Sequence, residues 1–156
     1  MTHLYAAVAG YVGRPDQKGG TGVFCRPAGQ DAWIHALDHL EAYTVVVHPK
    51  DPATVFAGTS DGVWRSTDQG KSFQRMQFPD TGKQVWCFLV DAGNPDLVYA
   101  GGSPIDLYRS EDRGASWRKL PNPQVPERCK APFAARVMRL AQHPSRPGEI
   151  YAALEV

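Results

Sequence analysis

The chain has 156 residues, which is enough for one domain with a hydrophobic core of its own. Its charges nearly cancel, with 17 Lys and Arg against 16 Asp and Glu, so the composition does not favour a nucleic-acid or acidic-lipid partner. No apolar run approaches the roughly 20 residues that span a membrane, and the first residues do not read as a signal peptide, so we expect a cytoplasmic protein.

The composition also favours short strands over helices. The chain has 15 glycines and 13 prolines, numbers that are typical of many short strands joined by turns. The three cysteines, Cys25, Cys87 and Cys129, lie far apart without metal-ligand spacing, and we expect reduced thiols. The sequence therefore predicts no metal site and no cofactor.

Alternating apolar residues and turn signals divide the chain into four groups of predicted strands. The first group is Leu4–Val8, Gly22–Arg26 and Ala32–Leu37. The second group is Tyr43–His48, Thr54–Thr59, Val63–Thr67 and Ser72–Gln77. The third group is Val85–Val90, Asp96–Gly101, Ile105–Ser110 and Ser116–Leu120. The fourth group is Arg136–His143 and, after a turn over Pro144–Glu149, Ile150–Glu155.

The two middle groups carry the same motif, Ser-x-Asp-x-Gly-x-Ser-aromatic, after their third strand. Its residues are Ser66, Asp68, Gly70 and Phe73, and then Ser110, Asp112, Gly114 and Trp117. The two Asp residues lie 44 positions apart. Four antiparallel strands that recur with such a period predict the blades of a β-propeller. The expected blades are 1–41, 42–79, 84–121 and 136–156 of a single domain.

The residue types and spacing of the motif are typical of a turn. The Asp carboxylate can accept hydrogen bonds from backbone N–H groups of its own turn. The Gly permits a positive φ, and the closing aromatic ring packs between neighbouring blades. Because this Asp recurs once per blade, whereas a catalytic group is needed once, we expect a structural role for it.

These residues resemble the Asp-box, also called the bacterial neuraminidase repeat, of the sialidase-like propeller proteins. The resemblance covers nearly the whole chain, although the first group keeps only an aromatic residue within Pro27–Trp33. It implies an all-β, partial β-propeller of four-stranded antiparallel Asp-box blades, with about three to four blades present. Proteins of this kind include sialidases, xyloglucan-degrading hydrolases and sorting receptors.

The predicted strands do not complete a ring. The opening blade lacks its inner strand and the closing blade lacks its outer two, which predicts the N-terminal part of a longer propeller. A split propeller completed by a second chain is the alternative. In either case we expect further blades to close the ring and the edge of the last strand to be exposed.

Ligands of propellers bind mainly on the face formed by two sets of loops. In this chain these loops are Gly10–Thr21, Ser60–Gly62, Ser103–Asp106, Asp38–Glu41, Phe78–Gln84 and Pro121–Ala135. The first and the last are unusually long, which is typical of functional loops. The candidate ligand-face residues are Arg14, Asp16, Lys18, Trp86, Glu127, Arg128, Lys130 and Arg136. Trp86 could stack on a sugar ring, but packing between blades is the favoured interpretation.

The resemblance implies two kinds of glycoside hydrolase. A sialidase needs an arginine cluster for a carboxylate and a Tyr–Glu pair. The nearest arginine motifs, Gly13-Arg14-Pro15 and Cys25-Arg26-Pro27, lack the expected apolar residue, although Arg136 and Arg139 could face the channel, and no Tyr–Glu pair can be assigned.

A xyloglucan hydrolase needs two carboxylates across a cleft. Asp16, Asp61, Asp80 and Asp106 lie on the appropriate face. We interpret the last three as turn residues, with Asp106 at the repeat position of Asp61. The recurring His48-Pro49 and His143-Pro144 are interpreted as structural turns.

The sequence therefore predicts a binding or scaffold module without catalysis by this chain alone. Its partner would be a glycan or a protein on the loop face. The alternative is part of a glycoside hydrolase, sialidase-like or, less favoured, xyloglucanase-like.

Overall fold

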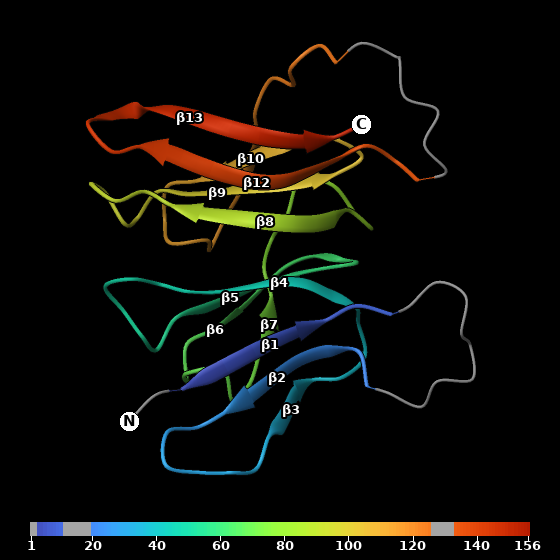
Figure 1. The fold of residues 1–156 in the computed structure, drawn as a ribbon, viewed down its shortest axis with the longest axis vertical. Coiled ribbons are helices and arrows are strands. Elements are labelled where there is room, and N and C mark those ends of the chain that lie inside the picture. Colours follow the sequence, from blue (N-terminus) through green and yellow to red (C-terminus); the bar gives the residue numbers. More distant parts are fainter. Residues whose placement is uncertain (1–2, 11–19, 126–132) are drawn as a thin grey trace.

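The computed structural model describes residues 3–10, 20–125 and 133–156 of the chain. These ranges contain strands and turns but no helix, so the predicted all-β fold is confirmed. In particular, the described part of the chain has no helix that is long and apolar enough to cross a bilayer. Four antiparallel sheets are stacked one on the next in chain order (Figure 1).

Each sheet corresponds to one predicted strand group. The first sheet consists of β1 (Leu4–Val8), β2 (Gly22–Arg26) and β3 (Ile34–Leu37). The second consists of β4 (Ala42–Val47), β5 (Val55–Thr59), β6 (Gly62–Ser66) and β7 (Gln74–Arg75). The third consists of β8 (Gln84–Val90), β9 (Val98–Ser103), β10 (Leu107–Ser110) and β11 (Arg118–Lys119). The fourth consists of β12 (Arg136–His143) and β13 (Arg146–Glu155).

Most strand boundaries lie within one or two residues of the prediction, and the differences at β7, β11 and β13 have a structural reason. The fourth strands β7 and β11 are only two residues long, because the Asp motif occupies the residues before them. The predicted turn over Pro144–Glu149 is wrong in its extent. His143 pairs with Arg146 in a tight hairpin, and the side-chain amide of Gln142 donates to the Pro147 carbonyl at 2.8 Å, so β13 begins four residues early.

The hydrophobic core lies between the sheets and is divided into three layers. Between the second and third sheets the core is Phe56, Val63, Phe78, Val85, Phe88, Val98, Ala100, Tyr108 and Trp117. Smaller layers hold the first sheet to the second and the third to the fourth, the latter around Cys87, Val137 and Leu140. Cys87 is free and buried, and burial raises the pKa of its thiol to about 11. Each sheet therefore depends on its neighbours for most of its apolar burial.

The two Asp motifs form turns with corresponding hydrogen bonds, which we call the Asp turns (residues 66–73 and 110–117). In the first, the Ser66 hydroxyl donates to Asp68 Oδ1 at 2.7 Å, and the N–H groups of Lys71 and Ser72 donate to the same oxygen at 3.0 Å. The Ser72 hydroxyl donates to Asp68 Oδ2 at 2.6 Å. The carboxylate thus satisfies donors of its own turn.

The second Asp turn repeats these contacts. The Ser110 hydroxyl donates to Asp112 Oδ1 at 2.7 Å, and the Ser116 hydroxyl donates to Asp112 Oδ2 at 2.6 Å. Gly70 and Gly114 have φ of 77° and 76°, a conformation that favours glycine. Both turns therefore use their carboxylate as an internal acceptor.

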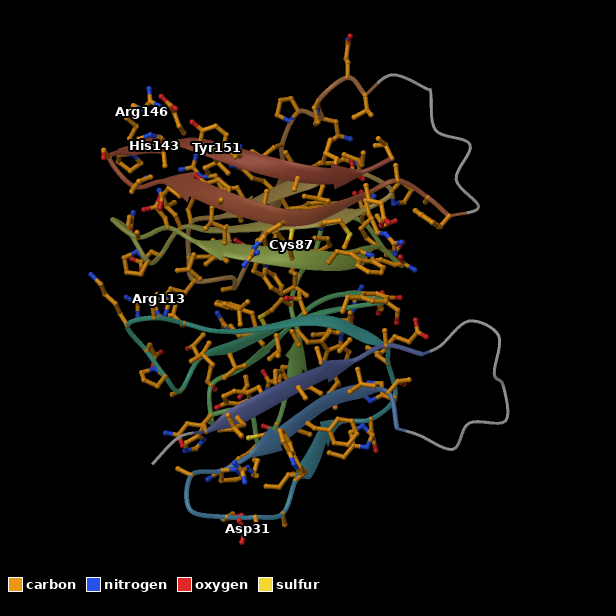
Figure 2. All side chains as sticks on the ribbon, in the orientation of Figure 1. Asp31, Cys87, Arg113, His143, Arg146 and Tyr151 are labelled. Carbon is orange, nitrogen blue, oxygen red and sulfur yellow. The ribbon has the colours of Figure 1, made fainter. Side chains whose placement is uncertain are left out.

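The His-Pro turn after β4 connects neighbouring sheets. His48 is buried, its Nδ1 accepts from the Lys50 N–H at 3.3 Å, and its Nε2 lies 2.9 Å from the Pro95 carbonyl. Because Nδ1 accepts, Nε2 carries the proton and donates. Figure 2 shows Arg113 of the second Asp turn on the same side of the molecule as His143 of the last hairpin. β8 and β12 begin on the opposite side, which is the side that the sequence analysis assigns to ligands (Figure 1).

Candidate functional site: a groove between the third and fourth sheets

A groove of about 290 Å³ lies where β8 and β12 begin and β9 ends. Its lining residues are Gly82, Gln84, Ser103, Pro104, Phe133, Ala134 and Arg136. Six of them come from three of the loops that the sequence analysis assigns to the ligand face, and Arg136 is the first residue of β12. The Ser103 hydroxyl donates to the Ala134 carbonyl at 3.3 Å, which holds the β9 end against the start of β12.

A stack of planar groups reaches this groove through two of its members, Arg136 and Phe133. The Tyr43 and Trp86 rings are parallel within 10°, with centroids 4.3 Å apart. The Arg136 guanidinium carbon lies 4.2 Å from the Trp86 ring centroid and 4.4 Å from that of Phe133. Two groups this close to one ring centroid must lie on opposite faces, so Trp86 has no free face for a sugar ring. Phe133, by contrast, is 43% exposed.

Polar partners fix the members of the stack. Tyr43 OH donates to Glu41 Oε2 at 2.8 Å, and Trp86 Nε1 donates to Gln84 Oε1 at 3.2 Å. The two acceptors occupy the same repeat position, two residues before the ring they bind. Burial, together with the Glu41 carboxylate, raises the pKa of Tyr43 far above its usual value.

Arg136 is held by an ion pair of its own. Its Nε donates to Glu155 Oε2, across the first pair of the β12–β13 ladder. The guanidinium is therefore fixed by an ion pair and by cation–π contacts on both sides. A rigid arginine of this kind can offer its remaining N–H groups to a ligand in the groove.

Next to the groove lies a charge network around a buried ion pair, which we call the Lys83–Asp106 cluster. Its members are Asp80, Lys83, Asp106, Tyr108, Lys119 and Asn122. The side chains of Lys83 and Asp106 form an ion pair and are only 8% and 9% exposed. Lys119 Nζ lies 2.9 Å from Asp106 Oδ1 and 3.2 Å from Asp80 Oδ2. The cluster ties together the loops before β8, before β10 and after β11.

The cluster keeps its carboxylates ionised. Burial by itself would raise the pKa of Asp106, but hydrogen bonds from Lys83, Asn122 and Lys119 outweigh it and hold the pKa below the usual range. Burial also raises the pKa of Tyr108 strongly, and its hydroxyl donates to Asp80 Oδ2 at 2.6 Å. A protonated phenol between two carboxylates acts here as a fixed donor.

The structure corrects the interpretation of Asp106 as a turn residue at the position of Asp61. The Gly102 N–H donates to the Asp106 carbonyl at 2.9 Å, so Asp106 takes the ladder position of Gly62, one residue later. Asp61 itself does more than form a turn. Arg75 binds it through two nitrogens at 2.9 and 3.1 Å, and the Gly82 N–H donates to it at 3.2 Å.

The predicted ligand-face residues divide into two sets. Arg14, Asp16, Lys18, Glu127, Arg128 and Lys130 lie outside the described residues, so no contact is assigned to them. Trp86 and Arg136 are brought together in the stack. Arg26, also considered for a carboxylate, lies at the Asp-turn end of β2, 3.9 Å from Asp31, and Arg139 is exposed on β12.

The sequence did not single out Phe133, Gln84 or Ser103. None belongs to a motif, and they come together only because β8, β9 and β12 are neighbours in space. A recurring signal did exist for Gln84, since it and Glu41 each precede an inner-strand aromatic by two residues. Within the described ranges no group of three or more His, Cys, Asp or Glu forms a candidate metal site.

The architecture is that of part of a β-propeller, and comparisons with known proteins agree on this fold. No family model matches the chain. It is 32% identical over 83 residues to a xyloglucanase of Hypocrea jecorina (strain QM6a), a match that covers 51% of this chain and 10% of that protein. The chain thus spans about a tenth of this curated relative.

Solved structures resemble the chain over more of its length. A GH74 xyloglucanase from Xanthomonas campestris has a TM-score of 0.65 and 20% identity, covering 97% of this chain and 27% of that one. YCF48 from Cyanidioschyzon merolae has a TM-score of 0.58 and 12% identity, covering 85% and 41%. An ancestral GH74 enzyme has a TM-score of 0.55 and 20% identity, covering 64% and 15%. These likenesses establish the propeller fold, and the sequence match relates it to glycoside hydrolases.

Proposed function

We propose that this protein is the glycan-binding part of a β-propeller related to glycoside hydrolases, and that its ligand is a β-glucan chain of the xyloglucan type. The observation that carries the proposal is the groove itself: an exposed aromatic ring beside fixed hydrogen-bonding groups. The sequence match to a xyloglucanase over 83 residues supports the choice of glucan.

The chemistry of the groove suits a neutral sugar. Phe133 offers an apolar ring surface, and the side chains of Gln84, Ser103 and Arg136 bring donors and an acceptor to the same groove. A few polar groups among apolar surface are the usual composition of a small-molecule site. Because the Arg136 charge is already balanced by Glu155, the groove has no strong preference for an anionic sugar.

Binding without turnover is the role that fits the lining. Glycoside hydrolysis requires two carboxyl groups on either side of the scissile bond, separated by roughly 5–9.5 Å. None of the seven described lining residues is acidic, and Asp106 nearby is engaged with Lys83. We therefore propose that the chain alone does not hydrolyse its ligand.

One observation favours the sialidase-like alternative. Tyr43 and Glu41 are in contact at 2.8 Å, and a Tyr–Glu pair is what a sialidase uses as nucleophile. Several features oppose it. One face of the Tyr43 ring is covered by Trp86, and its raised pKa disfavours a phenolate. Arg136, the nearest arginine for a sialic-acid carboxylate, is paired with Glu155.

Binding of xyloglucan oligosaccharides, cello-oligosaccharides and sialyllactose to the purified chain tests the proposal by isothermal titration calorimetry. We expect saturable binding of the β-glucans and none of sialyllactose. Phe133→Ala should weaken glucan binding at least tenfold, because it removes the exposed ring. Tyr151→Ala is the matched control, since Tyr151 is 52% exposed on β13 and lies outside the groove lining.

Binding of sialyllactose without binding of the β-glucans would reject the glucan proposal in favour of the sialidase-like alternative. Equal effects of the two aromatic substitutions would place the site elsewhere. Release of reducing sugar from xyloglucan by the purified chain would contradict the non-catalytic part of the proposal.

A further inference from the structure

The Arg136 guanidinium is enclosed on three sides. The Trp86 ring covers one of its faces at 4.2 Å, the Phe133 ring covers the other at 4.4 Å, and its Nε donates to Glu155. The part of the guanidinium that remains is the edge with Nη1 and Nη2, whose N–H groups donate to none of the described residues. Because Arg136 lines the groove, this edge is what it offers to a ligand.

The other polar side chains of the groove have their roles fixed by protein contacts. Gln84 Oε1 accepts from Trp86 Nε1 at 3.2 Å, and an indole N–H can only donate, so the amide nitrogen of Gln84 is left to donate to a ligand. The Ser103 hydroxyl donates its one proton to the Ala134 carbonyl at 3.3 Å, so its oxygen is left to accept. The groove therefore offers donors on Arg136 and Gln84 and an acceptor on Ser103.

This set of groups matches two neighbouring hydroxyl groups of a sugar. The two Nη atoms belong to one rigid, planar fork, which suits a pair of adjacent acceptor oxygens. A hydroxyl can accept from the fork and still donate its own proton to the Ser103 oxygen. A carboxylate also fits such a fork, but it has no proton to donate to Ser103, and Glu155 already balances the Arg136 charge.

The position of Phe133 decides which unit of a sugar chain meets this fork. One face of the Phe133 ring lies on Arg136, and the side chain is 43% exposed, so a sugar ring stacks on its other face. The Phe133 ring then separates that sugar from the guanidinium. The hydroxyl pair at Arg136 therefore belongs to a neighbouring unit of the same chain, and the shortest complete ligand has two units.

We propose that Arg136 determines the linkage specificity of the groove, by binding the 2-OH and 3-OH of an internal unit of a 1,4-linked β-glucan. In such a unit these two are the adjacent pair of free hydroxyl groups. Internal units of a 1,3-linked glucan have no adjacent free pair, because the 3-oxygen forms the linkage. A site built to hydrogen-bond a hydroxyl rejects a ligand without it, since its own polar groups stay unpaired. The inference rests on the proposed function and adds to it the residue that selects the linkage.

Isothermal titration calorimetry of the purified chain with cellotetraose and laminaritetraose tests this inference, because the two tetrasaccharides differ only in linkage. We expect cellotetraose to bind roughly tenfold more tightly. Arg136→Lys keeps the charge beside Glu155 but removes the planar fork, so it should weaken cellotetraose binding about tenfold and leave laminaritetraose binding unchanged. Arg139→Lys is the matched control, since Arg139 is exposed on the same strand and outside the groove lining.

Chitotetraose provides a second readout that does not depend on variants. It keeps the 1,4-linkage but carries an acetamido group in place of each 2-OH, so it should bind as weakly as laminaritetraose. If none of these oligosaccharides binds, the proposed function is wrong and the inference falls with it. Equal affinity for cellotetraose and laminaritetraose, or equal effects of Arg136→Lys and Arg139→Lys, would overturn the assignment to Arg136 and leave the binding of β-glucans in place.

Discussion

At the scale of single residues, the recurring Asp is explained by the donors that surround it. Asp68 accepts two hydroxyl and two backbone hydrogen bonds within one turn. Partial burial opposes the charge, but these hydrogen bonds, first from Ser72, outweigh it and lower the pKa of Asp68 to about 2. The carboxylate therefore stabilises the turn only while it is ionised.

This predicts a pH dependence that Asp68→Asn should remove. A carboxyl whose pKa is lower in the folded state stabilises the fold above its unfolded value, near 3.9, and the stabilisation is lost as pH falls toward 2. We expect the variant to be less stable by about 1 kcal/mol at pH 7, because the turn is exposed. The difference should shrink between pH 4 and pH 2 in urea denaturation. A constant difference over this range would contradict the role of the ionised carboxylate.

The Asp turns were predictable from sequence because their spacing encodes their contacts, whereas Asp106 was not. The role of Asp106 depends on Lys83, Lys119 and Asn122, which come from two other loops and share no motif with it. A one-residue error in the alignment of two repeats then moved Asp106 to an ordinary turn position. Local hydrogen bonds are visible in a sequence, and a buried long-range network is not.

At the scale of elements, the Lys83–Asp106 cluster supports the loops that form the groove. Gln84 and Ser103 face each other in the β8–β9 ladder, and the ion pair between Lys83, which directly precedes β8, and Asp106, which directly precedes β10, adds a second link between these loops. The Lys83 carbonyl also accepts from the Gly62 N–H at 2.7 Å, which extends the connection to the second sheet. The loops that line the groove are thus linked by charged side chains as well as by the strand ladder.

Removal of one partner of this ion pair should be costly. Asp106→Ala leaves the buried Lys83 ammonium without its main partner, and we expect a loss of about 3–5 kcal/mol in the free energy of unfolding. Asp80→Ala should cost about 1 kcal/mol, since Asp80 is 38% exposed. Chemical denaturation of both variants measures the difference. Recovery of stability by Lys83→Met in the Asp106→Leu background would identify the unpaired charge as the cause, and equal losses for Asp80 and Asp106 would refute this account.

At the scale of the whole molecule, the sheets are layers whose cores lie between them, and this arrangement decides what a sequence can reveal. Strand order follows chain order, so the repeat predicted thirteen strands and their grouping. The groove joins residues from the third and fourth sheets that are about fifty positions apart, such as Gln84 and Phe133. The two residues do not occupy equivalent positions of the sequence repeat, so only the folded chain brings them together.

The layered core also predicts which tryptophan stabilises the molecule. Trp117 closes the second Asp turn, donates from Nε1 to the Gly114 carbonyl at 3.1 Å and packs against Phe78 and Phe88 between two sheets. Trp117→Ala should therefore lower the free energy of unfolding by about 3–5 kcal/mol. Trp33 is 48% exposed, and Trp33→Ala should change it by no more than about 0.5 kcal/mol.

Urea denaturation followed by far-ultraviolet circular dichroism compares the two variants on the same scale, because each removes one indole. The asymmetry follows from the position of each ring: one lies in a layer that holds two sheets together, and the other at the outer strand of the first sheet. If both substitutions cost the same, the aromatic of the Asp turn does not join the sheets. Other contacts between the sheets would then have to hold the layers together.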